Sequence, residues 1–309
     1  MRKCLLLLVG LACTQAYSET RIVYGQDNRV DLKNVRNQKI QELSKSIAGR
    51  ISNYSYSTGS KNGHIAFEDI LKLSDPNSMN VCSDQKFSNQ PTVADCTGFL
   101  IADNILVTAG HCMTEMGIVV KNESSRGCLN NSWLFDYKVD SGGEIDLNNV
   151  KQSNIYGCKN VIYAKYEPMD DFAIIELDRK VVGRRPLKLN KSKAPRKNTK
   201  IFVMGHPSGL PMKYADGAKI FDVKNAYFST NLDTFGGNSG SPVFNAKTLM
   251  VEGILVRGDV DYYESRNVAG DTCMKVNVCS AQRSNCIEDD PGIEGEHVSL
   301  IARVLQNLL

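Results

Sequence analysis

The sequence predicts an all-β protein made of two antiparallel β-barrels and a C-terminal helix. Short apolar runs recur from residue 92 onward and are separated by turn residues, which is typical of antiparallel strands. A connector at residues 184–200, with two prolines and many basic side chains, divides these runs into two groups. The last stretch, His297–Leu309, places its apolar side chains at helical spacing.

The apolar runs set the expected positions of the strands. These are Phe99–Ile101, Ile105–Thr108, Trp133–Val139, Val161–Tyr163, Phe172–Leu177, Ile201–Met204, Lys219–Val223, Pro242–Phe244 and Val251–Val256. Upstream, residues 36–47 are expected to be helical and residues 52–63 to form a loop. The chain is therefore divided into a signal peptide (1–18), an N-terminal arm or propeptide (19–80) and a two-barrel domain (81–309).

The first 18 residues have the pattern of an export signal. A basic start, M-R-K-C, precedes the apolar run Leu5–Ala12, and small residues allow cleavage after Ala16 or Ser18. The apolar run is too short to span a bilayer. The expected location is therefore secreted or periplasmic, without stable membrane insertion. Attachment through a lipid on Cys13 is the less favoured alternative, because the residues before it form a poor lipidation motif.

Composition argues against a nucleic-acid partner. The net charge of the whole chain is +3, and removing Arg2 and Lys3 with the signal lowers it to +1. Such a balance creates no global field for polyanions. The basic side chains in residues 184–200 come with prolines and without aromatic residues, so this segment is interpreted as a solvated connector.

The cysteines indicate disulfides. Eight lie beyond the signal, and an even number in an exported chain is typical of a disulfide framework; they are Cys82, Cys96, Cys112, Cys128, Cys158, Cys273, Cys279 and Cys286. Cys128 and Cys158 flank one predicted hairpin region and are a candidate pair. Zinc is the alternative for Cys273, Cys279 and Cys286, but their spacing lacks a C-x-x-C pair, so we expect no metal and no cofactor.

The segment G-G-N-S-G-S-P-V-F-N, residues 236–245, indicates acyl-transfer chemistry. It places Ser239 between glycines, in a turn that leads directly into an apolar strand. Such a turn exposes the hydroxyl and directs backbone N–H groups toward whatever the hydroxyl attacks. The motif is common in soluble proteins, so it needs support from other segments.

Two further segments supply that support. T-A-G-H-C at 108–112 places His111 at the end of an apolar strand, and its imidazole is the candidate base for Ser239. D-D-F-A-I-I-E-L at 170–177 offers two carboxylates, Asp170 and Asp171, at the start of a strand. The chain order His, Asp, Ser is one of the known orders of a catalytic triad.

These motifs resemble those of the trypsin-like (chymotrypsin-fold) serine endopeptidases, over roughly residues 81–309. The resemblance rests on the three segments above and on C-T-G-F-L-I-A-D-N-I-L-V-T-A-G-H-C at 96–112, and Asn238 before the serine is similar to the bacterial branch that includes glutamyl endopeptidases. It implies two barrels of the chymotrypsin type, hydrolysis of peptide or protein substrates through an acyl-enzyme, and a Cys96–Cys112 disulfide. Because the family places its aspartate directly before the apolar strand, Asp171 is favoured over Asp170.

The resemblance also implies how the backbone would serve the reaction. The N–H groups of Gly237 and Ser239 would form the oxyanion hole, since glycine lets the peptide turn toward the substrate without a Cβ in the way. Val256 and Gly258 would offer backbone groups to an extended substrate, which would pair as an added strand.

The expected specificity rests on Asp233 and its neighbour. Asp233 stands six residues before the nucleophile, where trypsin-like enzymes hold the acid that binds Arg or Lys, and Thr234 stands where glutamyl endopeptidases carry Thr or Ser. Leu255 replaces the histidine with which those enzymes bind glutamate. We therefore expect cleavage after basic residues, with neutralisation of Asp233 by Arg257 as the alternative.

Two other interpretations are weaker. R-I-V-Y-G at 21–25 resembles the activation site of trypsin-like zymogens, but His111 lies 89 residues after Ile22, about twice the family's usual distance, and neutral Asn238 cannot pair with a freed N-terminus. An inactive homologue that only binds peptides is the functional alternative. The intact set of Ser239, His111 and Asp171 argues against it, and no extension supports a protease with regulatory domains.

Overall fold

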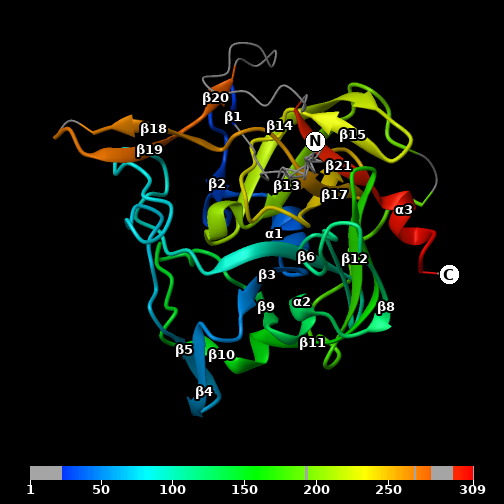
Figure 1. Ribbon diagram of the computed structural model, residues 1–309, viewed down its shortest axis with the longest axis horizontal. Coiled ribbons are helices and arrows are strands. Elements are labelled where there is room, and N and C mark those ends of the chain that lie inside the picture. The colour runs from blue at the N-terminus through cyan, green and yellow to red at the C-terminus, as the bar shows by residue number, and fades with distance from the viewer. Residues whose placement is uncertain (1–22, 192–193, 268, 280–294, 309) are drawn as a thin grey trace, which may run out of the picture.

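Two antiparallel β-barrels lie side by side in the structure (Figure 1). It is a computed structural model that describes residues 23–191, 194–267, 269–279 and 295–308. The expected signal peptide, Cys13 and Cys286 therefore lie outside the described residues. Among the helices that are described, none is both long enough and apolar enough to cross a membrane.

The first barrel closes through the pairing of β11 with β12. Its strands follow one another in the order β12, β7, β6, β3, β9 and β11, with β8 added on β11. Their bounds are β3 Ile47–Ser52, β6 Ala94–Ala102, β7 Ile105–Thr108, β8 Val119–Glu123, β9 Asn131–Phe135, β11 Ile155–Glu167 and β12 Asp170–Leu177. The short helix α2 (Arg126–Leu129) lies between β8 and β9 in the chain.

The second barrel closes in the same way, through β13 and β14. Its order is β13, β16, β17, β21, β15 and β14, with β2 added on β14. Their bounds are β2 Val30–Asp31, β13 Lys200–Gly205, β14 Lys213–Val223, β15 Tyr227–Thr230, β16 Pro242–Asn245, β17 Val251–Arg257 and β21 Glu296–Leu300. The expected all-β fold with two chymotrypsin-type barrels is thus confirmed.

The two barrels share a continuous apolar core. Phe172 and Ile174 of β12 belong to the same buried cluster as Phe244 and Ile254 of the second barrel. The hydroxyl of Ser299, in β21, donates to the carbonyl oxygen of Asp171 at 3.2 Å. This packing fixes the start of β12 against the second barrel, which matters because the two halves of the expected site come from different barrels.

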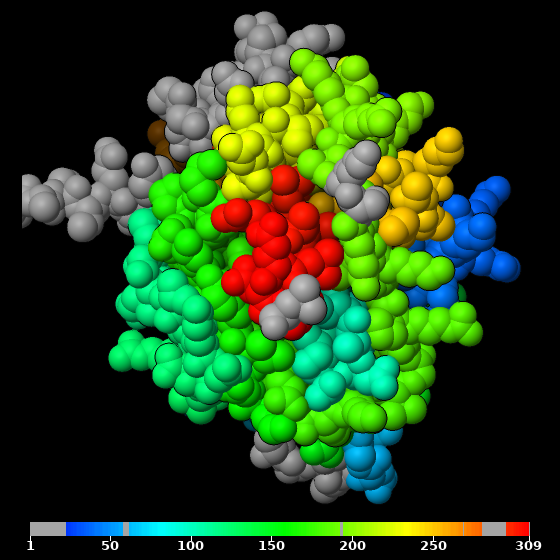
Figure 2. Space-filling model, turned by 90° about the vertical axis from the view of Figure 1, so that its right-hand side faces the viewer, coloured from blue at the N-terminus to red at the C-terminus, as the bar shows by residue number. Residues whose placement is uncertain are grey.

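The C-terminal helix is shorter than the sequence pattern predicts. Residues 296–300 form strand β21, and the helix α3 covers only Ile301–Leu305. The helical interpretation of His297 was wrong because β21 pairs with both β15 and β17, and these ladders override local periodicity. Ile301 and Val304 still bury their side chains in the shared core, and Figure 2 shows this red segment on the surface between green and yellow parts of the chain.

Much of the region before residue 81 is built into the barrels. The helix α1 (Gln38–Ser44) lies within the expected helical stretch, and β3 pairs with β6 and β9 inside the first barrel. The strand β1 (Val23–Tyr24) pairs with β20 (Val278–Cys279). The first barrel therefore begins before the expected boundary at residue 81. A separate small sheet holds β4 (Tyr56–Lys61), β5 (His64–Phe67) and β10 (Val150–Lys151).

Three disulfides are present in the part of the chain that the structure describes. Cys96–Cys112 and Cys128–Cys158 are the two expected pairs. The third, Cys82–Cys273, joins the loop before β6 to the hairpin of β18 (Tyr262–Arg266) and β19 (Thr272–Val276), which projects from the body in Figure 1. Cys279 is disulfide-bonded as well, so the zinc alternative loses Cys273 and Cys279 as thiolate ligands.

Candidate active site

Asp171 binds the segment that carries His111 through three hydrogen bonds. One carboxylate oxygen accepts from the backbone N–H of Gly110 at 2.7 Å and of His111 at 3.1 Å. The other oxygen lies 2.8 Å from Nδ1 of the His111 ring. Asp171 is only 1% exposed. The carboxylate therefore fixes both the backbone and the ring of His111, and leaves Nε2 as the atom that faces away from it.

The neighbouring Asp170 points to the other face of β12. Its carboxylate is bound by Arg303 of α3 and by Lys165 of β11. Burial would raise the pKa of Asp170, but hydrogen bonds from Arg303 and Lys165 outweigh it and lower the pKa. Alternation along a strand explains why two adjacent aspartates have such different partners. Asp170 fastens the C-terminal helix to the first barrel, and only Asp171 reaches His111.

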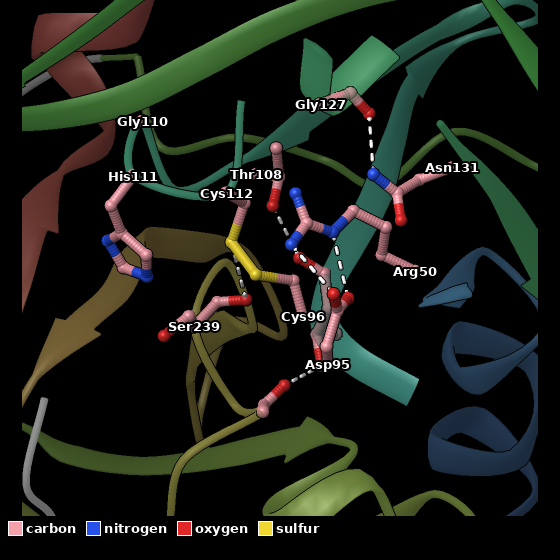
Figure 3. The surroundings of a disulfide bond; sticks show 12 residues. Arg50, Asp95, Cys96, Thr108, Gly110, His111, Cys112, Gly127, Asn131 and Ser239 are labelled. Atoms are coloured by element: carbon pink, nitrogen blue, oxygen red, sulfur yellow. Dashed lines mark hydrogen bonds and ion pairs between the residues drawn. A yellow bond between two sulfur atoms is a disulfide. The ribbon is translucent and has the colours of Figure 1, made fainter. Parts of the chain in front are cut away.

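The turn with Ser239 lies beside the histidine loop. In Figure 3 the side chains of His111 and Ser239 lie on the same side of the Cys96–Cys112 disulfide. The Sγ atom of Cys112 is 3.9 Å from the Ser239 carbonyl oxygen, and that oxygen accepts from the N–H of Thr97 at 2.7 Å. Residues 97 and 112 of the first barrel thus position the serine of the second.

The backbone of the serine turn has a defined orientation. The Gly236 carbonyl oxygen accepts from the N–H of Ser208 at 2.5 Å, and the Asn238 carbonyl oxygen accepts from the N–H of Ser241 at 2.8 Å. In a trans peptide the next N–H points the opposite way. The N–H groups of Gly237 and Ser239 are therefore turned away from these partners.

Gly237 occupies a position that no other residue would fit well. Its φ is +84°, and an added Cβ would lie 2.5 Å from the carbonyl oxygen of His206. Both constraints favour glycine. The loop 205–209 therefore packs directly behind the expected oxyanion turn.

Thr97 and His206 were missed by the sequence reasoning as parts of the site. The Thr97 hydroxyl donates to the Gly237 carbonyl oxygen at 2.8 Å and accepts from the His206 N–H at 3.1 Å. The neighbouring residues could have indicated both: Thr97 directly follows the disulfide cysteine Cys96, and His206 lies in the turn-forming sequence G-H-P-S-G. Together they connect the first barrel to the serine turn.

His206 is a buried, neutral histidine rather than a second base. Its ring stacks on Tyr137, with centroids 5.3 Å apart and 14° between planes, and Nδ1 lies 3.0 Å from the Leu210 carbonyl oxygen. Burial lowers the pKa of His206 to about 3. The imidazole therefore serves as a rigid support for the turn behind Ser239.

A cleft of about 590 Å³ opens next to His111. Polar and charged side chains form much of its lining; they include Arg50, Thr114, Glu115, Glu123, Arg126 and Asn131. Arg50 is held by Asp95 through two bonds of 2.8 Å (Figure 3). An open cleft beside the candidate base gives a peptide room to approach.

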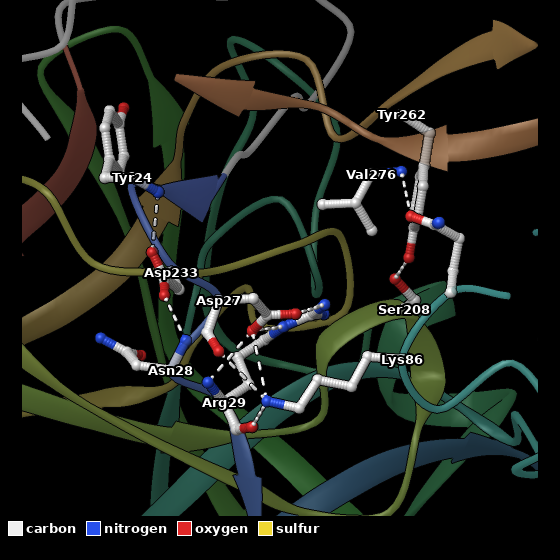
Figure 4. Close-up of polar contacts among 10 residues, drawn as sticks. Tyr24, Asp27, Asn28, Arg29, Lys86, Ser208, Asp233, Tyr262 and Val276 are labelled. Atoms are coloured by element: carbon white, nitrogen blue, oxygen red, sulfur yellow. Dashed lines mark hydrogen bonds and ion pairs between the residues drawn. The ribbon is translucent and has the colours of Figure 1, made fainter. Parts of the chain in front are cut away.

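Asp233 does not face such an opening. One of its carboxylate oxygens accepts from the N–H of Tyr24 at 2.8 Å and the other from the N–H of Asn28 at 3.0 Å (Figure 4). Burial raises the pKa of Asp233 to about 6, although both backbone N–H groups act to lower it. The N-terminal segment thus takes up the carboxylate that was expected to bind a basic substrate side chain.

The other expected substrate-binding residues lie elsewhere. Thr234 is fully buried and its hydroxyl donates to Oε2 of Glu296. Val256 lies at a register shift between β17 and β21, beyond the last β17 pair with β16 at Ile254. Gly258 follows β17 directly and lies against the Glu296 carboxylate.

Arg257 does not take the role expected of it as the alternative partner of Asp233. Its guanidinium donates to the Pro168 carbonyl oxygen at 2.6 Å.

One group near the site has metal-binding atoms. Ligand atoms of Cys96, His111 and Cys112 lie within 4.8 Å of one another. However, the two sulfurs are joined in a disulfide, and cysteine binds a metal as the thiolate. The residues present therefore do not fit a metal centre.

The family comparison agrees with this geometry. The trypsin-like peptidase domain matches residues 96–254, just over half of the chain. The chain belongs to the trypsin-like peptidases. It is accordingly a serine endopeptidase.

The chain is similar to several solved structures at low sequence identity. A Glu endopeptidase is 18% identical, with a TM-score of 0.43, over 82% of this chain and 94% of that one. The VesB protease of Vibrio cholerae is 12% identical, with a TM-score of 0.48, over 91% and 66%. The Rv3671c protease of M. tuberculosis is 15% identical, with a TM-score of 0.42, over 86% and 89%.

Proposed function

We propose that this peptidase hydrolyses peptide bonds through an acyl-enzyme on Ser239, with His111 as base and Asp171 as its partner. The observation that carries the proposal is the set of three bonds from the Asp171 carboxylate to the backbone and ring of the histidine segment. A carboxylate on Nδ1 selects the tautomer with a proton there, so Nε2 can accept the serine proton.

The reaction then proceeds in two halves. Ser239 Oγ attacks the substrate carbonyl carbon as its proton passes to His111 Nε2, and the carbonyl oxygen takes up the negative charge. The N–H groups of Gly237 and Ser239 stabilise that charge; losing one such donor typically costs about 10²–10³ in rate. The imidazolium next gives its proton to the leaving amine, which departs as the C–N bond breaks.

Water completes the cycle. His111, now neutral, takes a proton from a water molecule, whose oxygen attacks the acyl carbon. Collapse of the second tetrahedral intermediate breaks the bond to Ser239 Oγ, and the proton returns to the serine. The balance needs only peptide and water, so no cofactor takes part in this scheme.

We also propose an exported enzyme that keeps residues 23–80. Export is supported by the basic and apolar start of the sequence and by the disulfides, which persist in oxidising compartments. Retention of residues 23–80 is supported by β3, which pairs on both sides within the first barrel. N-terminal sequencing of the enzyme from its native source checks both points.

Cleavage after basic residues is part of the proposal. Asp233 supports it less well than expected, because its carboxylate binds the N-terminal segment. Another buried carboxylate, Glu296, contacts two of the expected substrate-binding residues. The rival function, an inactive homologue that only binds peptides, has no observation in its favour.

The first prediction tests the nucleophile. Ser239→Ala should lower kcat/KM by at least about 10⁴, as removal of a triad member does, without changing the thermal midpoint by more than a few degrees. The measurement is hydrolysis of a peptide library, with labelling of the enzyme by an organophosphonate. Wild-type hydrolysis by the variant, or labelling of it at the wild-type rate, would show that Ser239 is not the nucleophile.

A further inference from the structure

Thr97 contacts the serine turn from the first barrel at two points. It lies in β6, is completely buried, and directly follows the disulfide cysteine Cys96. Its hydroxyl donates to the Gly237 carbonyl oxygen at 2.8 Å, and its backbone N–H donates to the Ser239 carbonyl oxygen at 2.7 Å. One residue of the first barrel thus binds two carbonyl groups of a turn that belongs to the second.

The Thr97 hydroxyl has a fixed direction. A hydroxyl carries one proton and can also accept a hydrogen bond. The backbone N–H of His206 donates to Thr97 Oγ1 at 3.1 Å, so the single hydroxyl proton is left for the Gly237 carbonyl oxygen. His206 is itself held in place, because its ring stacks on Tyr137. The donor that reaches Gly237 is therefore oriented by its own surroundings.

The turn needs such a contact because two glycines, Gly236 and Gly237, stand in succession. Glycine rotates about φ and ψ more freely than any other residue. The peptide between the two glycines has its carbonyl oxygen bound by the N–H of Ser208 at 2.5 Å. The next peptide, between Gly237 and Asn238, has its carbonyl oxygen bound by the Thr97 hydroxyl. Since each peptide is planar, these two bonds together set both dihedral angles of Gly237.

The direction of the Gly237 N–H depends on those angles. This N–H is one of the two groups proposed to stabilise the charged carbonyl oxygen of the substrate. Removal of the Thr97 hydroxyl would leave the buried Gly237 carbonyl oxygen without this donor and would free one of the two peptides to rotate. An N–H that is no longer held in advance stabilises the transition state less well.

We propose that Thr97 is a positioning residue for the oxyanion hole, and that its hydroxyl holds Gly237 in the orientation that stabilises the transition state. This inference rests on the proposed function. Thr97 acts through Gly237 and does not itself touch the reacting atoms. Because the disulfide joins Cys96 to Cys112, next to His111 (Figure 3), the same segment of β6 connects the candidate base to the oxyanion turn.

The test compares two substitutions at position 97. Thr97→Val keeps the shape of the side chain and removes the hydroxyl, whereas Thr97→Ser keeps the hydroxyl. Outright loss of one oxyanion donor typically costs about 10²–10³ in rate, and a loosened donor should cost less. We expect Thr97→Val to lower kcat by about 10–50-fold with KM changed by less than about threefold, and Thr97→Ser to stay within about threefold of the wild type in both. Steady-state kinetics on one peptide, at a temperature at which every variant is folded, measures these values.

Thr230→Val is the matched control for stability. Thr230 is also completely buried, and its hydroxyl donates to the Lys219 carbonyl oxygen at 2.9 Å, between two strands of the second barrel. Both Thr→Val substitutions therefore remove a buried hydroxyl from a backbone carbonyl group, and denaturant unfolding should show similar losses of stability. Only Thr97→Val should lower kcat by more than about threefold.

A transition-state analogue separates positioning from a general structural effect. A peptide boronic acid forms a tetrahedral adduct with a serine nucleophile and places one oxygen in the oxyanion position. Its Ki should rise in Thr97→Val by about the same factor by which kcat/KM falls, because both report binding of the tetrahedral state. The Ki should stay within about threefold of the wild-type value in Thr97→Ser and Thr230→Val.

Four outcomes would each overturn the inference: wild-type kcat in Thr97→Val, a loss no larger than that of Thr230→Val, an equal loss in Thr97→Ser, or a boronate Ki that does not follow kcat/KM. If Thr97→Val does not fold, Thr97→Ala takes its place, and activity equal to that of Thr97→Ser would count against the hydroxyl. Failure of the proposed function has a different signature, because Ser239→Ala would then keep its activity whatever the effect of Thr97→Val.

Discussion

The catalytic end and the specificity end of this active site are assembled in different ways. At the catalytic end, Asp171 binds the backbone of the same T-A-G-H-C segment that carries His111. Those contacts span 60 and 61 positions, and at the specificity end Asp233 binds residues 205 and 209 positions away. Both ends therefore depend on contacts between distant segments, but the expected catalytic residues lie in recognisable sequence motifs, whereas the partners of Asp233 do not.

The sharpest contrast at the catalytic end is between two adjacent aspartates. Asp171→Asn should lower kcat by about 10⁴, because an amide can no longer hold the imidazole in the required tautomer. Asp170→Asn should cost less than about tenfold in kcat, since Asp170 binds Arg303 and Lys165 instead. Steady-state kinetics on one peptide measures both, and a loss of equal size in Asp170→Asn would break the assignment.

His206 should make the catalytic end sensitive to acid. Burial lowers the pKa of His206 to about 3. Below pH 6.5 its imidazole is therefore protonated in the unfolded chain but stays neutral in the folded protein. Stability should therefore fall as the pH falls, by about 1.4 kcal/mol per unit until pH approaches 3. Denaturant unfolding against pH measures the slope, and His206→Phe, which keeps a ring on Tyr137, should remove this part of it.

The His206 assignment can also be checked directly. The ring protons of His206 should show no titration step between pH 8 and 4 by NMR, whereas an ordinary histidine titrates near 6.5. A step near 6.5 in the folded protein would contradict the buried, neutral state.

Asp233 should give the specificity end the opposite pH dependence. Its pKa is raised to about 6 by burial, so between about pH 4 and 6 the folded protein holds a proton that the unfolded chain has lost. The contribution of Asp233 to stability should fall as the pH rises through this window, by up to about 3 kcal/mol. The difference in unfolding free energy between the wild type and Asp233→Asn should follow that curve, and a difference independent of pH would refute it.

Most of the fold followed from sequence patterns because strand alternation and turn residues are local signals. Ile105–Thr108 is β7 with unchanged bounds, and the nine expected runs all overlap strands. The C-terminal segment failed because His297 and Val298 have helical spacing yet pair on both sides of a barrel strand. The segment I-A-G-R-I-S, before the expected boundary at residue 81, has no local pattern that would show that β3 pairs with β6 and β9.

The candidate site shows the same difference between residues in local motifs and residues placed by long-range packing. Ser239, His111 and Asp171 lie in motifs whose spacing reports their roles, and the structure brings His111 and Asp171 into contact. Asp233 has the right sequence position for a pocket acid, but its contacts with Tyr24 and Asn28 depend on how the N-terminal segment packs.

The Cys82–Cys273 bond has a consequence for the order of events during synthesis. Its two cysteines are 191 residues apart, while the cysteines of the other two bonds are 16 and 30 residues apart. The short-range bonds can close while the first barrel is still emerging, but Cys273 appears only after Ser239 and its turn have been made. This bond therefore shows that synthesis has passed strands β13 to β17 of the second barrel, and a truncated chain that ends before Cys273 can never form it.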